Sequence, residues 1–163
     1  MKIVFPGSFD PITYGHLDLI KRASQLFDEV VVALLTNPNK KSLFSVDERI
    51  MFLQQEVQLF SNVTVVAVEH DLTVNVVKKM NAQGILRGLR NVKDFEYEQE
   101  IALTNQHLAP QLETIFLMAQ PQYSFISSSM VKEVAKFNGD VTKLVTPQVA
   151  QALQRKLANE CAK

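Results

Sequence analysis

Short apolar runs alternate with helical hydrophobic patterns along the whole chain. The apolar runs, most of them rich in β-branched residues, lie at 2–5, 29–35, 63–68, 84–88 and 114–119. Continuous runs of this kind are typical of strands that are covered on both faces. Helical spacing and helix-start signals predict helices near 16–27, 46–58, 73–81, 95–107, 128–137 and 147–159.

This alternation predicts an α/β fold. Strands and helices of these lengths form a Rossmann-like, doubly wound sheet of five parallel strands with helices on both faces. The length of 163 residues suits one domain, and we expect a single domain over 1–163. Ser45 with Glu48 forms a capping box for the second predicted helix, and Asp94 is expected to cap the fourth.

The loops after the five strands are expected to meet at one edge of the sheet. Right-handed crossovers bring the carboxyl ends of parallel strands together, and α/β proteins bind ligands there. The five loops are 6–15, 36–45, 69–73, 87–94 and 120–129. Because most of the chain's unusual polar chemistry lies in them, we expect the functional site at this edge.

Several classes of protein are disfavoured by the sequence. It has neither a G-x-G-x-x-G motif after the first strand nor a P-loop motif. The 17 basic and 17 acidic residues cancel, which argues against a nucleic-acid partner. We find no metal-ligand cluster, no membrane span and no signal peptide. The single cysteine, Cys161, suits a reducing compartment, so we expect a cytoplasmic protein.

His16 is the first candidate for chemistry. It follows Gly15 in the first turn of a predicted helix. The positive end of the helix dipole disfavours an imidazolium but tolerates a neutral ring that donates one hydrogen bond to an anion. From its position alone, a structural role that covers the strand edge remains open.

The basic residues of the loops are candidates for phosphate binding. Lys40 and Lys41 stand in the second loop, and Arg87 and Arg90 bracket Gly88 in the fourth. Guanidinium groups grip phosphate in bidentate fashion, and glycine lets a backbone approach a ligand. The alternatives are solvated lysines and surface ion pairs between the arginines and nearby carboxylates, namely Asp94, Glu96 or Glu98.

Ser127, Ser128 and Ser129 open a predicted helix. One serine is enough to cap it, so the others leave hydroxyl groups beside free backbone N–H groups, which is a suitable phosphate cradle. Tyr123 and Phe125 could flank a flat base. A redundant cap with two core aromatics is the alternative interpretation.

Two motifs carry a family resemblance. The stretch "TYGH" (13–16) resembles the T-x-G-H motif of the nucleotidyltransferase superfamily, and "ISSSMVKE" (126–133) resembles its second signature. With "PGSFDPIT", "RGLRNVKDFEYE" and "GDV", the chain resembles the phosphopantetheine adenylyltransferase family over about 2–158. The resemblance implies transfer of AMP from ATP to 4′-phosphopantetheine, giving dephospho-coenzyme A and pyrophosphate, with Mg²⁺, by a homohexamer.

The resemblance also implies roles for matched positions. The ATP-binding residues would be Ser8, Phe9, His16, Gly88, Leu89, Arg90, Glu98, Tyr123, Ser124, Phe125, Ile126, Ser127, Ser128 and Ser129. The substrate side would consist of Ser8, Lys40, Thr73 and Arg87, and His16 would be the catalytic residue that stabilises the transition state. The acceptor phosphate is already nucleophilic, so direct in-line attack without a covalent intermediate requires positioning and charge neutralisation.

The sequence departs from the family pattern at a few positions. Ser8 replaces the usual threonine, Tyr123 a tryptophan, Phe5 a tyrosine, and Thr73 a larger apolar residue. The last change makes Thr73 the weakest assignment. Two alternatives stay open: another small nucleotidyltransferase, such as one acting on nicotinamide mononucleotide or glycerol phosphate, and a nucleotide-sensing module without turnover.

Overall fold

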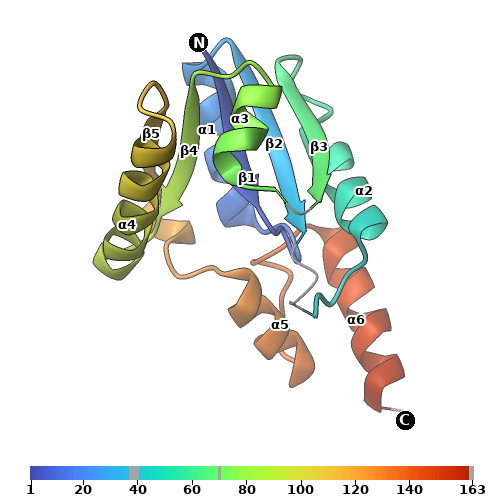
Figure 1. Cartoon of the computed structure of the whole chain (residues 1–163). Coiled ribbons are helices and arrows are strands. Elements are labelled where there is room, and N and C mark those ends of the chain that lie inside the picture. Colours follow the sequence, from blue (N-terminus) through green and yellow to red (C-terminus); the bar gives the residue numbers. More distant parts are fainter. Residues whose placement is uncertain (37–40, 70, 162–163) are drawn as a thin grey trace.

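In the computed structural model, which describes residues 1–36, 41–69 and 71–161, five parallel strands form one sheet in the order β3-β2-β1-β4-β5 (Figure 1). The strands are β1 (Lys2–Gly7), β2 (Glu29–Thr36), β3 (Val63–Glu69), β4 (Gly84–Leu89) and β5 (Glu113–Met118). Each neighbouring pair runs parallel. The predicted sheet is therefore confirmed, with β1 at its centre.

The predicted helices are all present, with ends within three residues of the expected ones. They are α1 (Tyr14–Leu26), α2 (Val46–Val57), α3 (Thr73–Lys79), α4 (Val92–Leu108), α5 (Ser128–Lys136) and α6 (Pro147–Cys161), with a short 3-10 helix η1 (Pro121–Tyr123) before α5. None of the helices in these described ranges is both long and apolar enough to cross a membrane.

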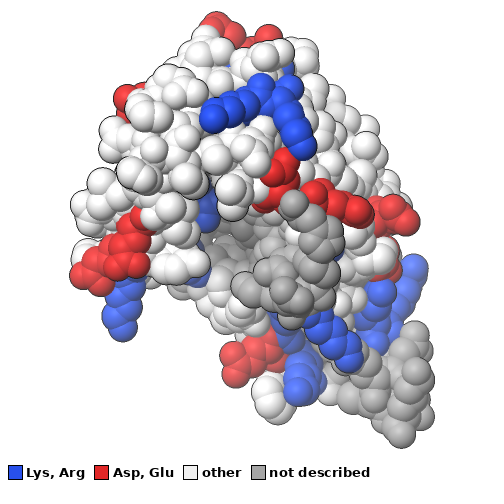
Figure 2. All heavy atoms as spheres, viewed as in Figure 1, with Lys and Arg blue, Asp and Glu red and all other residues white. Residues whose placement is uncertain are grey.

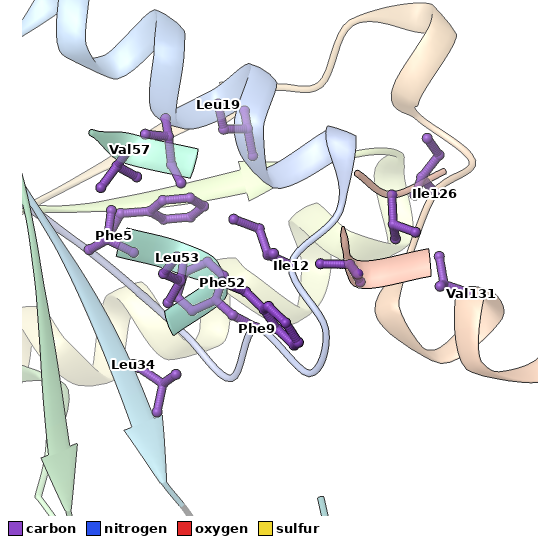
Figure 3. Close-up of a cluster of buried hydrophobic side chains, with 14 of the residues drawn as sticks. Phe5, Phe9, Ile12, Leu19, Leu34, Phe52, Leu53, Val57, Ile126 and Val131 are labelled. Carbon is purple, nitrogen blue, oxygen red and sulfur yellow. The ribbon is translucent and has the colours of Figure 1, made fainter. Parts of the chain in front are cut away.

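The central strands separate two hydrophobic cores. Successive side chains of a strand point to opposite faces, so Ile3 and Phe5 enter one core while Val4 enters the other. The first core takes side chains from α1, α2, α5 and α6, and Figure 3 shows part of it. The second takes side chains from α3 and from the segment after α4. Helices therefore cover both faces, as expected.

The start of α4 corrects one prediction. The cap is Asn91, whose side chain accepts a hydrogen bond from the backbone N–H of Asp94 at 3.0 Å. Asp94 lies inside the first turn, and its carboxylate instead accepts from Nε of Arg90 at 2.8 Å. The prediction that Asp94 caps the helix was wrong. Asparagine and aspartate can both cap a helix, and here the carboxylate of Asp94 binds Arg90, so Asn91 is the cap.

Replacing Asn91 by alanine should lower the free energy of unfolding by about 1 kcal/mol, because the N–H of Asp94 loses its acceptor. Asn91→Ser should retain most of the stability. Urea unfolding curves would measure both, with Gln99→Ala, an exposed change inside the same helix, as the control. An equal loss in the control would contradict the assigned cap.

Candidate active site

A cavity of about 460 Å³ lies at the carboxyl ends of β1 and β4. Figure 2 shows the hollow below the sheet, with basic side chains at its rim. Many of the residues predicted from the sequence line this cavity: Ser8, Phe9, His16, Arg87, Gly88, Arg90, Glu98, Tyr123, Ile126, Ser127 and Ser128. Residues from the first, fourth and fifth loops therefore meet at one place.

Other predicted residues lie elsewhere. Leu89, Ser124, Phe125, Ser129 and Thr73 are not among the lining residues. Leu89 is buried within the fold, whereas 58% of Phe125 is exposed, so the interpretation of Phe125 as a core aromatic was wrong. Thr73 is the first residue of α3. Lys40 lies outside the described residues.

The cavity also has lining residues that sequence reasoning missed. Lys93 and Tyr97 of α4 line it, as does Thr13 from the loop before α1. Lys93 and Tyr97 are four residues apart, so they lie on one helical face, and Tyr97 directly precedes Glu98. That spacing was the available signal, because it places a basic and an aromatic side chain beside the predicted carboxylate.

The ring of His16 is held by a reciprocal cap at the start of α1. The Thr13 hydroxyl accepts from the backbone N–H of His16, and the backbone N–H of Thr13 donates to Nδ1 of His16 at 3.1 Å. A backbone N–H can only donate, so Nδ1 must be the acceptor. When the ring is neutral, its proton is therefore on Nε2, where it is available as a donor.

The surroundings of His16 keep the ring neutral. Burial, and then the positive charge of Arg90, lower the pKa of His16 to about 4. The ring also packs edge-on against Phe9, with 5.1 Å between the ring centroids. At neutral pH the cavity therefore contains an uncharged imidazole that can donate one hydrogen bond but binds a proton weakly.

The two predicted arginines pair with carboxylates inside the cavity. Arg87 donates from Nε to Glu98 at 2.6 Å, from Nη2 to the same carboxylate, and from Nη1 to the carbonyl of Pro6 at 2.9 Å. Arg90 forms a bidentate pair with Asp94. The ion-pair alternative is thus observed, but an arginine has five N–H donors, so Arg87 retains two for an anion.

Two glycines at the cavity have a packing role. A Cβ atom on Gly88 would lie 2.2 Å from Cδ1 of Leu19, and one on Gly7 would lie 2.9 Å from the ring of Phe9. Neither glycine has a positive φ. Side chains of the fold occupy the space that a Cβ atom would take at both glycines, and both residues line the cavity. The expectation that Gly88 lets a ligand approach the backbone stays a prediction.

The serine-rich segment is partly used by the fold itself. The Ser127 hydroxyl caps α5 by accepting from the N–H of Met130 at 3.1 Å. The Ser128 hydroxyl donates to the carbonyl of Pro11 at 2.7 Å. Ser128 can still accept a hydrogen bond, so it links the first loop to the cavity wall without losing all capacity for a ligand.

The described residues do not form a metal site of their own. No group of three or more His, Cys, Asp or Glu side chains in that part of the chain could hold a metal ion. The cavity carboxylates Asp94 and Glu98 are each neutralised by an arginine. Mg²⁺ commonly needs only one or two carboxylates, or none, when substrate phosphates and water supply its ligands.

Comparison with known proteins agrees with the resemblance. Residues 4–134 match the family model described as cytidylyltransferase-like. Phosphopantetheine adenylyltransferases from Levilactobacillus brevis and Alkaliphilus metalliredigens are 50% and 48% identical, each over 96% of this chain and over 97% and 99% of their own lengths. A Plasmodium falciparum nicotinic acid mononucleotide adenylyltransferase complexed with NaAD has the same fold, with a TM-score of 0.71, 18% identity and 94% of each chain covered.

The lowered pKa of His16 predicts a pH-dependent contribution to stability. Between about pH 6.5 and pH 4 the unfolded chain protonates this ring while the folded chain does not. The unfolding free energy should therefore fall as the pH decreases through this range, by up to about 1.4 kcal/mol per pH unit. Above about pH 6.5 the ring is neutral in both states, so its contribution to stability is fully present and no longer changes with pH.

The effect can be isolated by subtraction. Unfolding curves of the wild type and of His16→Gln, measured from pH 4 to pH 8, share all other titrating groups. Their difference should be constant above pH 6.5 and change steadily below it. Parallel curves over the whole range would mean that the folded and unfolded pKa values are the same.

Proposed function

The chain belongs to the cytidylyltransferase-like family and, within it, to the phosphopantetheine adenylyltransferases, and from this premise we propose that its cavity transfers AMP from ATP to 4′-phosphopantetheine. It is therefore a nucleotidyltransferase. The observation that carries the proposal is the neutral His16, with its Nε2–H free at a cavity that also holds paired arginines.

The reaction needs no protein nucleophile. A phosphate oxygen of phosphopantetheine attacks the α-phosphorus of ATP, forming one P–O bond. The bond from that phosphorus to the bridging oxygen breaks, and the electron pair leaves with pyrophosphate. Dephospho-coenzyme A and pyrophosphate account for all atoms, and the attacking phosphate has no proton that must be removed.

In this proposal His16 stabilises negative charge rather than moving a proton. Charge builds on the oxygens of the α-phosphate as the new bond forms. An N–H donor that is already oriented lowers the barrier because it needs no reorganisation. The bond from Thr13 to Nδ1 supports this role, because it leaves Nε2 as the protonated nitrogen.

We propose that Arg87 contacts the acceptor phosphate with its two remaining donors, while Glu98 keeps the guanidinium in place. Lys40 is proposed to act on the same side. Arg90 and the other predicted ATP-binding residues are assigned to the nucleotide, and Ser8 is assigned to both substrates. Thr73 stays the weakest assignment, because it is not among the residues that line the cavity.

We also propose that Mg²⁺ enters with ATP, held by phosphate oxygens and water. The donor set of the cavity supports this form of binding, because its carboxylates Asp94 and Glu98 already neutralise arginines. When bound, the ion would neutralise triphosphate charge. The protein residues would still align the two substrates and supply the donor from His16.

Self-association is proposed for the surface of α4. Glu98 is the buried residue of this helix, whereas the exposed fractions are 72% for Val92, 64% for Tyr97 and 60% for Leu103. Large exposed apolar surfaces mark interaction sites, which supports a homo-oligomer. The homohexameric state is an expectation that comes from the family resemblance, and the cytoplasmic location is one that comes from the single cysteine.

The substrate assignment predicts pyrophosphate release from ATP with 4′-phosphopantetheine as acceptor. Nicotinamide mononucleotide and glycerol phosphate should give only background, because the acceptor side is assigned to a pantetheine phosphate. A coupled pyrophosphate assay with each acceptor measures this directly. Turnover with nicotinamide mononucleotide or glycerol phosphate, and none with phosphopantetheine, would contradict the assignment.

The donor role predicts a graded effect of substitutions at His16. His16→Ala should lose at least ~10²-fold in turnover with little change in ATP affinity, because the lost interaction is strongest in the transition state. His16→Asn and His16→Gln keep an N–H donor but cannot take a proton, so they should retain measurably more activity than alanine.

The pH dependence supplies a second readout for His16. Since its pKa is lowered to about 4, turnover should show no loss from His16 protonation between pH 6 and pH 8. If both amide variants were as inactive as alanine while still binding ATP, and wild-type turnover followed one deprotonation near neutral pH, a general-base role would replace the donor role.

A further inference from the structure

Arg49 is a buried cation that the proposed mechanism does not use. It lies on α2 with only 4% of its surface exposed. Its Nη1 donates to the carbonyl of Ser8 at 2.9 Å, and its Nε donates to the carbonyl of Ser45 at 3.3 Å. Over the described residues it forms no salt bridge. Buried charges are usually paired, so its position needs a reason.

The contact with Ser8 orients the next peptide group. Arg49 is not among the residues that line the cavity, whereas Ser8 and Phe9 are. The peptide between Ser8 and Phe9 is trans, since the only cis bond in the described chain is Asp10–Pro11. In a trans peptide the carbonyl and the N–H point in opposite directions. The N–H of Phe9 therefore points away from Arg49.

The backbone at Phe9 is restrained further. Its φ is 44°, in the left-handed region that bulky residues rarely adopt. The ring is almost fully buried and packs edge-on against Phe5 and His16. Figure 3 shows it in the same buried hydrophobic cluster as Phe52 of α2. Within the described ranges no hydrogen bond uses the N–H of Phe9, so this donor remains available.

We propose that Arg49 is a positioning residue that holds the Ser8–Phe9 peptide so that the N–H of Phe9 donates to a phosphate oxygen of the bound nucleotide. The inference rests on the proposed function, since it takes the anion in the cavity to be ATP. A guanidinium suits the task because its planar fork reaches two carbonyls at once. The bond to its charge also polarises the Ser8–Phe9 peptide, which strengthens the opposite N–H as a donor.

The direct test is an NMR titration of ¹⁵N-labelled protein with ATP. In the wild type the Phe9 amide signal should move strongly downfield as ATP binds. In Arg49→Met the shift should fall to less than half, and kcat/KM for ATP should drop about 10- to 100-fold, because the donor is no longer oriented. The KM for phosphopantetheine should change less than kcat/KM for ATP, since Arg87, which is assigned to its phosphate, is held by Glu98 and Pro6 rather than by Arg49.

Three further variants separate positioning from stability and charge. Val57→Ala removes buried packing from the same helix, and Arg155→Met removes an exposed charge from α6. Both should keep the Phe9 shift and the ATP parameters of the wild type. Arg49→Lys keeps the charge and one donor but not the fork, so it should fall between the wild type and Arg49→Met. If Arg49→Met does not fold, Arg49→Lys tests the positioning role in its place.

The results for the Arg49 variants can be distinguished from the result of the pyrophosphate assay. A Phe9 shift and kcat/KM that are unchanged in Arg49→Met and Arg49→Lys, or equally reduced in Val57→Ala, would overturn the positioning role. If the wild type shows the ATP-dependent shift but releases no pyrophosphate with phosphopantetheine, the proposed function fails. The role of Arg49 in orienting the anion donor would then still stand.

Discussion

The central place of β1 in the sheet is the constraint on which the rest of the structure depends. β1 pairs in parallel with β2 on one side and with β4 on the other, so the order of the strands reverses there. At such a point the loops that follow neighbouring strands diverge and leave a crevice. The loop after β1 must therefore cross the edge of the cavity, and α1 must begin beside it with His16 in its first turn.

That loop is held by side chains from other elements. Three carbonyl groups between Pro6 and Pro11 accept hydrogen bonds from Arg87, Arg49 and Ser128. The carboxylate of Asp10 in turn accepts from two backbone N–H groups of the segment before α2 and from a lysine of α5. The geometry around His16 is thus set by β4, α2 and α5 together, since each supplies at least one anchor.

The start of α4 and the surroundings of Gly88 show what local sequence reasoning leaves undecided. Asp94 was expected to cap α4, but it pairs with Arg90 and leaves the cap to Asn91. At Gly88 the side chain of Leu19 occupies the space that a Cβ atom would take, while Gly88 itself lines the cavity. In both places a neighbouring side chain determines the outcome. A local sequence pattern identifies residues that can cap a helix or line a site. It does not determine which of several possible partners each of them contacts.

The sequence by itself determined the order and type of the elements, because apolar periodicity and turn residues act over a few positions. It also determined that His16 and the arginines would lie near the carboxyl ends of strands at one edge, although Arg87 belongs to β4 itself rather than to the loop after it. Only the tertiary structure decided which nitrogen of His16 carries the proton, which carboxylate each arginine meets, and that Lys93 joins the cavity while Thr73 does not. The first two outcomes involve residues 3 to 11 positions apart, and they depend on the exact positions of side chains, which a pattern of residue types does not specify. The third depends on how α3 and α4 are placed relative to the cavity.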